Sequence, residues 1–384
     1  MPGVTRNLLR ALAAVVVLAT AALIGWRVLG PAEVIEVATE PYPVAVVRAP
    51  GVAGKTTQAP LIVDGRIRVY AGKRLVKADG PVDFRTMHTP RWSFRRWPAQ
   101  VSGVVAVGTT VVSRWTDGEL VALDGRTGTV AWRAGGPAGP GFAGRTGAAA
   151  VWAPPGLHVA GTSVLVAAGQ RLLARSAADG SLRWTADLPP GCADNSFVTA
   201  GGRFVCGTGA WDVLSGAVVR GWPSGPSTPV GCDVARSACG GLRDASGQGW
   251  LTGDRRPHRA TALDQPGTTA AGGLVLATSG DAVTASGAAS WSWPGNAQVL
   301  GVRANKVVLL TATLELVTLD AQTGRQLARF AAYTDNERVE PWKPHLWQVT
   351  DAFVALERLR PGAGADPDEH DHYYTIDPEI LAAI

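Results

Sequence analysis

The sequence predicts an all-β protein, a propeller of four-stranded blades preceded by one apolar N-terminal helix. Three observations support this fold class. A strand–turn–strand pattern recurs, its spacing is nearly constant, and no helix-period pattern follows the N-terminal run. The chain has 384 residues, 46% hydrophobic and 17% charged, so it can bury a large core. The net charge of +5 does not by itself indicate nucleic-acid binding, and we expect no such partner.

The repeat is clearest in residues 120–133, LVALDGRTGTVAWR. One apolar run ends at Asp124, the turn contains Gly128, and a second run contains Trp132. Aspartate can bond its own backbone, glycine adopts the positive φ of a tight turn, and tryptophan can fill the gap between twisted sheets. Five weaker copies follow, at Gly180 and Trp184, Asp212 and Gly216, Asp244, Gly247 and Trp250, Gly287 and Trp291, and Asp320 and Gly324. Arg220 and Ala328 stand in the tryptophan position of two copies.

The spacing of these turns predicts the architecture. From Gly128 to Gly324 there are five intervals over 196 residues, about 39 residues each, close to the ~40–45-residue period of propeller blades. One such blade cannot bury both faces alone, so blades stack and close a ring. Fainter strands at 69–97 and 351–381 add a first and a last blade, and residues 43–49 are expected to close the ring. Eight blades are favoured over seven, within residues 45–384.

The segments LVALDGRTGTVAW and LVTLDAQTGRQLA resemble the PQQ-like (pyrroloquinoline-quinone-type) β-propeller repeat. The resemblance covers about residues 45–384, most strongly at those two copies. It implies a propeller, as found in quinoprotein dehydrogenases and in non-catalytic envelope propellers such as the outer-membrane assembly lipoprotein. A dehydrogenase would imply a quinone, a calcium ion, a catalytic Asp and, in many members, adjacent cysteines. The closest cysteines here are Cys232 and Cys239.

We therefore expect no cofactor and no enzymatic activity, and a scaffold or protein-binding module of the cell envelope. Two alternatives from other classes are a quinoprotein-like dehydrogenase and a sensor that binds a small molecule in the central channel.

The N-terminus predicts export. Arg6 and Arg10 precede the charge-free run Ala11–Trp26, and Arg27 follows. The alternative to a membrane span is a cleaved signal peptide, with the small-residue pattern Ala19–Ala21 as its cleavage site. Because the run continues past that site, we expect an uncleaved single-pass anchor over residues 1–30 and a linker over 31–44. The amino terminus would be cytoplasmic and the propeller extracytoplasmic, with the cytoplasmic membrane and an unidentified envelope protein as partners.

Four cysteines lie in one stretch. An even number in an exported chain indicates two disulfides, whereas a zinc site is disfavoured because no CxxC occurs and no histidine lies among them. The favoured pairs are Cys192–Cys206 and Cys232–Cys239, each joined by a short predicted turn. The alternative pairs are Cys192–Cys232 and Cys206–Cys239.

Three other motifs are assigned to structure rather than chemistry. APGVAGKT (49–56) lacks the first glycine of a phosphate loop and is expected to be an exposed linker. PRWSFRRW (90–97) could bind an anionic surface, but blade packing is favoured. DPDEHDHYY (366–374) gathers possible metal ligands in what is expected to be a solvated loop: Asp366, Asp368, Glu369, His370, Asp371 and His372. No nucleophile–base constellation is assigned, so we expect no catalytic, cofactor-binding or metal residue.

Overall fold

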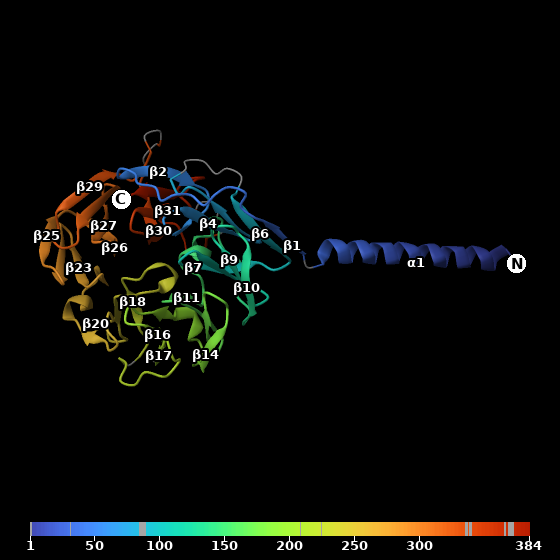
Figure 1. Cartoon of the computed structure of the whole chain (residues 1–384), viewed down its shortest axis with the longest axis horizontal. Helices are drawn as coiled ribbons and strands as arrows, with labels where there is room; N and C mark the ends of the chain where they lie inside the picture. The colour runs from blue at the N-terminus through green and yellow to red at the C-terminus, as the bar shows by residue number, and fades with distance from the viewer. Residues whose placement is uncertain are drawn as a thin grey trace.

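Eight β-sheets form a closed ring in the computed structural model, and helix α1 (Pro2–Leu29) extends away from it (Figure 1). The structure describes residues 2–30, 32–83, 90–207, 209–223, 225–334, 337, 340–364, 366–367 and 372–384. Among these residues, no helix is both long and apolar enough to cross a membrane, so the structure does not support the expected transmembrane helix.

The first four sheets are numbered in chain order, each from its innermost strand outward. Blade 1 contains β3 (Leu61–Val63), β4 (Ile67–Gly72), β5 (Leu75–Asp79) and β6 (Trp92–Trp97). Blade 2 contains β7 (Val101–Val107), β8 (Thr110–Trp115), β9 (Glu119–Asp124) and β10 (Val130–Gly135). Blade 3 contains β11 (Leu157–Ala160), β12 (Ser163–Ala168), β13 (Arg171–Ser176) and β14 (Leu182–Asp187). Blade 4 contains β15 (Phe197–Val198), β16 (Arg203–Cys206) and β17 (Gly209–Asp212), and a single bridge from Trp211 to Val218 takes the place of a fourth strand.

The remaining four sheets complete the ring. Blade 5 contains β18 (Thr228–Val230), β19 (Gly241–Arg243), β20 (Gly249–Leu251) and β21 (His258–Arg259). Blade 6 contains β22 (Thr268–Ala271), β23 (Leu274–Ser279), β24 (Ala282–Gly287) and β25 (Trp291–Pro294). Blade 7 contains β26 (Ala297–Arg303), β27 (Lys306–Thr311), β28 (Glu315–Asp320) and β29 (Gln326–Ala331). Blade 8 contains β30 (Lys343–Val349), β31 (Phe353–Leu359), β32 (Glu379–Ala383) and β2 (Gly51–Thr56). The eight-bladed prediction is confirmed.

Ring closure uses a different segment from the one predicted. The outermost strand of blade 8 is β2, which pairs antiparallel with β32, so strands from both ends of the chain share one sheet. Residues 43–49, expected to close the ring, contain no strand, and 49–56, expected to be an exposed linker, contains β2. The sequence does not reveal β2 because two of its six residues are glycine, which weakens a strand pattern, and because its partner β32 lies near the other end of the chain.

Part of the predicted linker 31–44 is also a strand. β1 (Ala32–Glu36) pairs with the outer edge of β6 and adds a fifth strand to blade 1. Glu33 on β1 accepts hydrogen bonds from Arg96 of blade 1 (2.8 Å) and Arg133 of blade 2 (2.6 Å). Two arginines of PRWSFRRW therefore pair with carboxylates, Arg96 with Glu33 and Glu119 and Arg91 with Glu40, while Trp92 and Phe94 are buried.

The repeated tryptophan joins one blade to the next at four of the eight junctions. The indole of Trp132 in blade 2 lies against Gly180, in the turn of blade 3, and its Nε1–H donates to the Ala177 carbonyl at 2.9 Å. The same arrangement recurs at three other junctions, for Trp92 with Gly128, Trp184 with Gly216, and Trp291 with Gly324. Each turn glycine has a positive φ, near 70–77°. Glycine is therefore needed twice, for its backbone angle and for the absence of a Cβ beneath the indole.

The weaker copies of the repeat depart from this arrangement. Nothing lies within 4 Å of a Cβ placed on Gly247, so no indole covers the turn of blade 5. Trp250 instead donates to Asp244 of its own blade at 2.9 Å. Gly287 has a positive φ, but the atoms nearest to its Cβ position belong to Gly273 and Leu274 of the adjacent strand rather than to a tryptophan. The repeat therefore specifies every one of these turns but not every blade junction.

A matched pair of glycine substitutions tests this junction. Gly161 has a positive φ and no atom within 4 Å of its Cβ position, whereas a Cβ on Gly180 would lie 2.5 Å from the Trp132 ring. We expect Gly161→Ala to cost about 1–3 kcal/mol of unfolding free energy from backbone strain alone, and Gly180→Ala to cost more. Trp132→Ala should itself cost about 3–5 kcal/mol and lower protein abundance.

In the Trp132→Ala background, the excess cost of Gly180→Ala over Gly161→Ala should disappear, because the clash has been removed. Denaturant unfolding of Gly161→Ala and Gly180→Ala, each measured with and without Trp132→Ala, gives the four free energies that this double-mutant comparison needs. An excess that persists without the indole would contradict the docking arrangement.

Candidate functional site

The central channel is the place where a propeller gathers residues from several blades, and here two inserts of the chain occupy it. The first is the short helix α2 (Ala148–Val151), between blades 2 and 3, which packs with Trp152 in a buried cluster with strands of blades 1, 2 and 8. The second is the loop 232–239 between β18 and β19, closed by the Cys232–Cys239 disulfide, which we call the plug. The two inserts meet where the Ala235 N–H donates to the Trp152 carbonyl at 2.7 Å.

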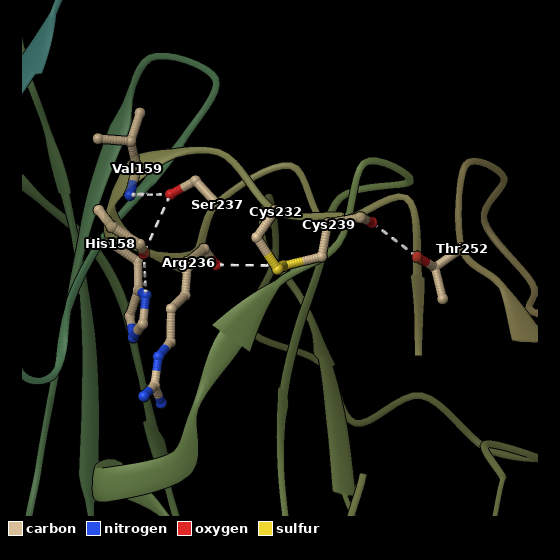
Figure 2. Close-up of a disulfide and its surroundings, with 8 residues drawn as sticks. His158, Val159, Cys232, Arg236, Ser237, Cys239 and Thr252 are labelled. Atoms are coloured by element: carbon tan, nitrogen blue, oxygen red, sulfur yellow. Dashed lines mark hydrogen bonds between the residues drawn. A yellow bond between two sulfur atoms is a disulfide. The ribbon is translucent and has the colours of Figure 1, made fainter. Parts of the chain in front are cut away.

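The plug spans the axis of the ring. It extends from blade 5 and bonds to blade 3, where His158 contacts the Ala235 carbonyl at 2.7 Å and the Val159 N–H donates to Ser237 at 3.1 Å (Figure 2). On the other side, Asp233 forms an ion pair with Arg303 of blade 7. Blades 3 and 7 are opposite each other in an eight-membered ring, so a loop bonded to both closes the channel.

The plug is held rigidly for its size. Cys239 donates its N–H to Val198 at 2.9 Å, and its carbonyl accepts the Thr252 hydroxyl at 2.7 Å (Figure 2). The left-handed residues Ala235, Arg236 and Ala238 turn the chain within the eight-residue loop. Cys192 and Cys206 form the second disulfide, so the favoured pairing is the one that the structure contains.

His158 of blade 3 bonds directly to the plug. A carbonyl can only accept, so the His158 Nδ1–H donates to Ala235. Nε2 contacts the Ser196 hydroxyl oxygen at 2.9 Å, and that hydroxyl donates to the Ala193 carbonyl at 2.8 Å. Burial lowers the pKa of His158 to about 4. This Ser–His contact resembles a nucleophile–base pair, but both side chains are 1% exposed and Nδ1 faces a carbonyl rather than a carboxylate. We assign it a structural role, which no sequence motif indicated.

A cavity of about 610 Å³ opens between the plug and the innermost strands of blades 6, 7, 8 and 1; we call it the channel mouth. Its charged residues are Asp64, Asp233, Asp351 and Arg303. Burial raises the pKa of Asp233, although the Arg303 guanidinium opposes that shift. The mouth is therefore a mixed polar and apolar hollow, built by segments far apart in the sequence.

Another buried polar cluster lies farther along blade 8, where β31 and β32 place Glu357 opposite Glu379. Glu379 is fully buried, and desolvation together with the neighbouring carboxylate raises its pKa well above the usual value. Glu357 accepts a hydrogen bond from Thr146 (2.6 Å), which precedes α2, and contacts His345 at 2.6 Å. Glu357 thus connects blade 8 to the segment that precedes α2.

The acidic run 366–374 is only partly placed. Asp368, Glu369, His370 and Asp371 lie outside the described residues, and His372 is buried. Among the described residues, no group of three or more His, Cys, Asp or Glu side chains is positioned to hold a metal ion. Asp124, Asp212, Asp244 and Asp320 all accept backbone hydrogen bonds within their own turns, the structural use expected for them.

Removing the plug disulfide should expose the loop to protease. We expect the double variant Cys232→Ser/Cys239→Ser to be cleaved by trypsin after Arg236, which is exposed, more than tenfold faster than the parent. The physical reason is that a disulfide contributes about 2–4 kcal/mol of restraint and 1.4 kcal/mol corresponds to one factor of ten. Mass spectrometry of the reduced digest measures the rate. The control Cys192→Ser/Cys206→Ser should leave Arg236 protected, and equal cleavage in both would contradict a plug held by its own disulfide.

The buried imidazole predicts a pH dependence. The folded pKa of His158, about 4, lies below its ordinary value of 6.5, so its contribution is present above pH 6.5 and is lost as the pH falls toward 4. The full loss is on the order of 3 kcal/mol. His158→Gln, which can still donate to Ala235 but does not ionise, should reduce the slope of unfolding free energy against pH in that window. His258→Gln, at an exposed position, is the control; equal slopes in the two variants would refute the assignment.

Part of the chain matches a known protein family, and several solved structures are similar to it. Residues 63–205 match the PQQ_2 family model, described as outer membrane protein assembly factor BamB; the match covers less than half of the chain. No curated protein sequence matches the chain. The solved structures that are similar include BamB from Moraxella catarrhalis (15% identity, 90% of this chain and 99% of that chain, TM-score 0.43).

Two other similar structures are of different proteins. One is the C-terminal WD40 domain of Sif2 (11% identity, 88% of this chain and 99% of that chain, TM-score 0.45). The other is the quinohemoprotein alcohol dehydrogenase from Comamonas testosteroni (13% identity, 91% of this chain and 76% of that chain, TM-score 0.43). The eight sheets show that the chain is an eight-bladed β-propeller, and the family match shows the PQQ-like repeat in residues 63–205.

Proposed function

We propose that this chain is a non-enzymatic protein-binding scaffold of the cell envelope. The observation that carries the proposal is the closure of the central channel by α2 and the plug, which are hydrogen-bonded to each other. Catalysis in a propeller needs polar groups from several blades that converge on a space open to substrate. Here the polar groups nearest the axis, His158, Ser196 and Asp233, bond to the inserts or to neighbouring blades. A protein partner would therefore bind at the end faces or the outer edges of the ring.

Two further features support this choice. The family matched by residues 63–205 is described as an outer membrane protein assembly factor, and proteins of assembly machinery act through protein contacts. Both disulfides indicate an oxidising compartment, which agrees with an extracytoplasmic propeller. Attachment to the cytoplasmic membrane through residues 1–30 also belongs to the proposal; it rests on the apolar run Ala11–Trp26 and its flanking arginines.

A small-molecule sensor is the second candidate, and the channel mouth favours it. Its volume of about 610 Å³ lies within the range of ligand pockets, about 300–1,000 Å³. A sensor would melt at a higher temperature with its ligand present.

Site-specific photo-crosslinking in intact cells separates the candidates. A photoreactive residue would replace Asp351 at the channel mouth or, as a remote position, Leu214 in the turn of blade 4; both are exposed. We expect Asp351 to capture one envelope protein reproducibly, and fractionation to recover the complex outside the cytoplasm. Dye-linked alcohol or sugar oxidation that requires added quinone and calcium would contradict the scaffold and favour the dehydrogenase. A melting shift with small molecules, without any captured protein, would favour the sensor.

A further inference from the structure

Among the junctions without a docked tryptophan, the one between blades 7 and 8 combines an accessible hollow with a main-chain acceptor for an indole. In the four docked junctions, the indole pairs across the sheet with an alanine: Ala78 with Trp92, Ala122 with Trp132, Ala174 with Trp184, and Ala285 with Trp291. In blade 7 the same register position pairs Thr318 with Ala328. The tryptophan that fills the four docked junctions is therefore replaced by Ala328 between blades 7 and 8.

The turn that would receive this indole is interrupted by the ring closure. The third and fourth strands of blade 8 are β32 and β2, so Ile384 and residues 46–50 lie where other blades have a continuous turn. The Ile384 N–H donates to Ala352, in the same way as the Ala321 N–H donates to Asn305 in blade 7. Because Ala321 is the carbonyl that accepts the Trp291 indole, the Ile384 main-chain oxygen is the corresponding acceptor in blade 8.

The Ile384 main-chain oxygen already accepts a hydrogen bond from a flexible side chain, that of Lys306. Lys306 Nζ donates to the Ile384 oxygen at 2.7 Å. A lysine side chain that reaches a single main-chain oxygen can be displaced to neighbouring water, because its ammonium is strongly hydrated and its stem is flexible. The polar requirement of a docked indole is therefore retained at this junction, although the chain supplies no indole.

The junction between blades 7 and 8 also retains a hollow at the place where an indole would lie. A cavity of about 340 Å³, which we call the open slot, is lined mainly by apolar side chains, among them Val47, Pro50, Leu327, Ala328, Phe353 and Ile384. Val47 is 99% exposed and Leu327 is 42% exposed, so the slot is accessible from solvent. Exposed apolar side chains around an accessible hollow are typical of a recognition site rather than of a blade interior.

We propose that the open slot binds a tryptophan side chain presented by a protein partner, in the way that the other junctions bind their own indoles. The occupant is specified by the internal symmetry of the ring: four junctions show the same register position and carbonyl acceptor satisfied by an indole. The partner is the protein that the proposed scaffold function requires, and the slot gives its contact residue. Trp and Tyr are also the residues that most often anchor protein interfaces.

The binding test uses 5-fluoroindole as the probe, followed by fluorine NMR on the full chain. We expect saturable binding to the parent protein and at least a tenfold loss of affinity in Ala328→Trp, which fills the slot from within. Leu214→Trp, which adds a tryptophan at a remote exposed position, should bind as the parent does. Trp291→Ala opens an equivalent slot between blades 6 and 7 and should add a second site, which shows that the probe reports this geometry.

Several outcomes would overturn the proposal. Binding to Trp291→Ala but not to the parent would show that the open slot rejects an indole. Unchanged affinity in Ala328→Trp would place the probe elsewhere. If Ala328→Trp does not fold, Val47→Glu at the exposed rim replaces it and should weaken binding by at least threefold; unchanged affinity in that variant would equally count against the slot.

The partner is tested separately, by crosslinking from a photoreactive residue at Val47. We expect capture of an envelope protein at a tryptophan-containing peptide, lost in Ala328→Trp. Capture that persists in Ala328→Trp would leave the scaffold function standing and reject the slot as its contact. Indole binding without any captured protein from Val47 would reject a protein as the source of the indole.

Discussion

The docking of one blade's indole on the next blade's turn glycine is the contact on which the ring depends. A four-stranded sheet has two apolar faces, and the gap between neighbouring twisted sheets widens toward the outer strands. The tryptophan lies on the outermost strand, at the wide end of that gap, and its N–H bonds to a turn carbonyl of the next blade. It thus contributes buried area and orientation together. The left-handed glycine beneath it allows the indole to approach the backbone.

The junctions without this contact are stabilised by other means. Blades 4 and 5 lack the docked pair on the turn of blade 5, and both disulfides lie in the segment from residue 192 to 239 that leads into and between them. Blade 8 lacks a continuous turn, and there two chain segments share one sheet while the buried Glu357 accepts a hydrogen bond from Thr146, which precedes α2. Disulfides and buried hydrogen bonds therefore occur at blades where the repeat is incomplete. Opening one weak junction would open the whole ring, so these junctions need other contacts.

The same irregular regions carry the functional proposals. A regular blade uses its turns and its tryptophan for packing and leaves little free for a partner. The plug that closes the channel is an insert in the irregular blade 5, and the open slot results from the interruption of blade 8. Regular blades build the ring, and departures from the repeat decide what it can bind.

The sequence by itself determined the propeller and its turn residues, and it favoured eight blades over seven and the pairs Cys192–Cys206 and Cys232–Cys239 over their alternatives. Each follows from local chemistry: an Asp–Gly turn, a tryptophan at fixed spacing, or two cysteines joined by a short loop. It did not identify β1 or β2 as strands, since an added edge strand and a closing strand depend on a partner far away in the chain. It also missed His158 and Asp233, which carry no motif; their roles come from bonds across the channel, to Ala235 and Arg303. Only the tertiary structure could decide these contacts, because they join residues about 70 or more positions apart in the sequence.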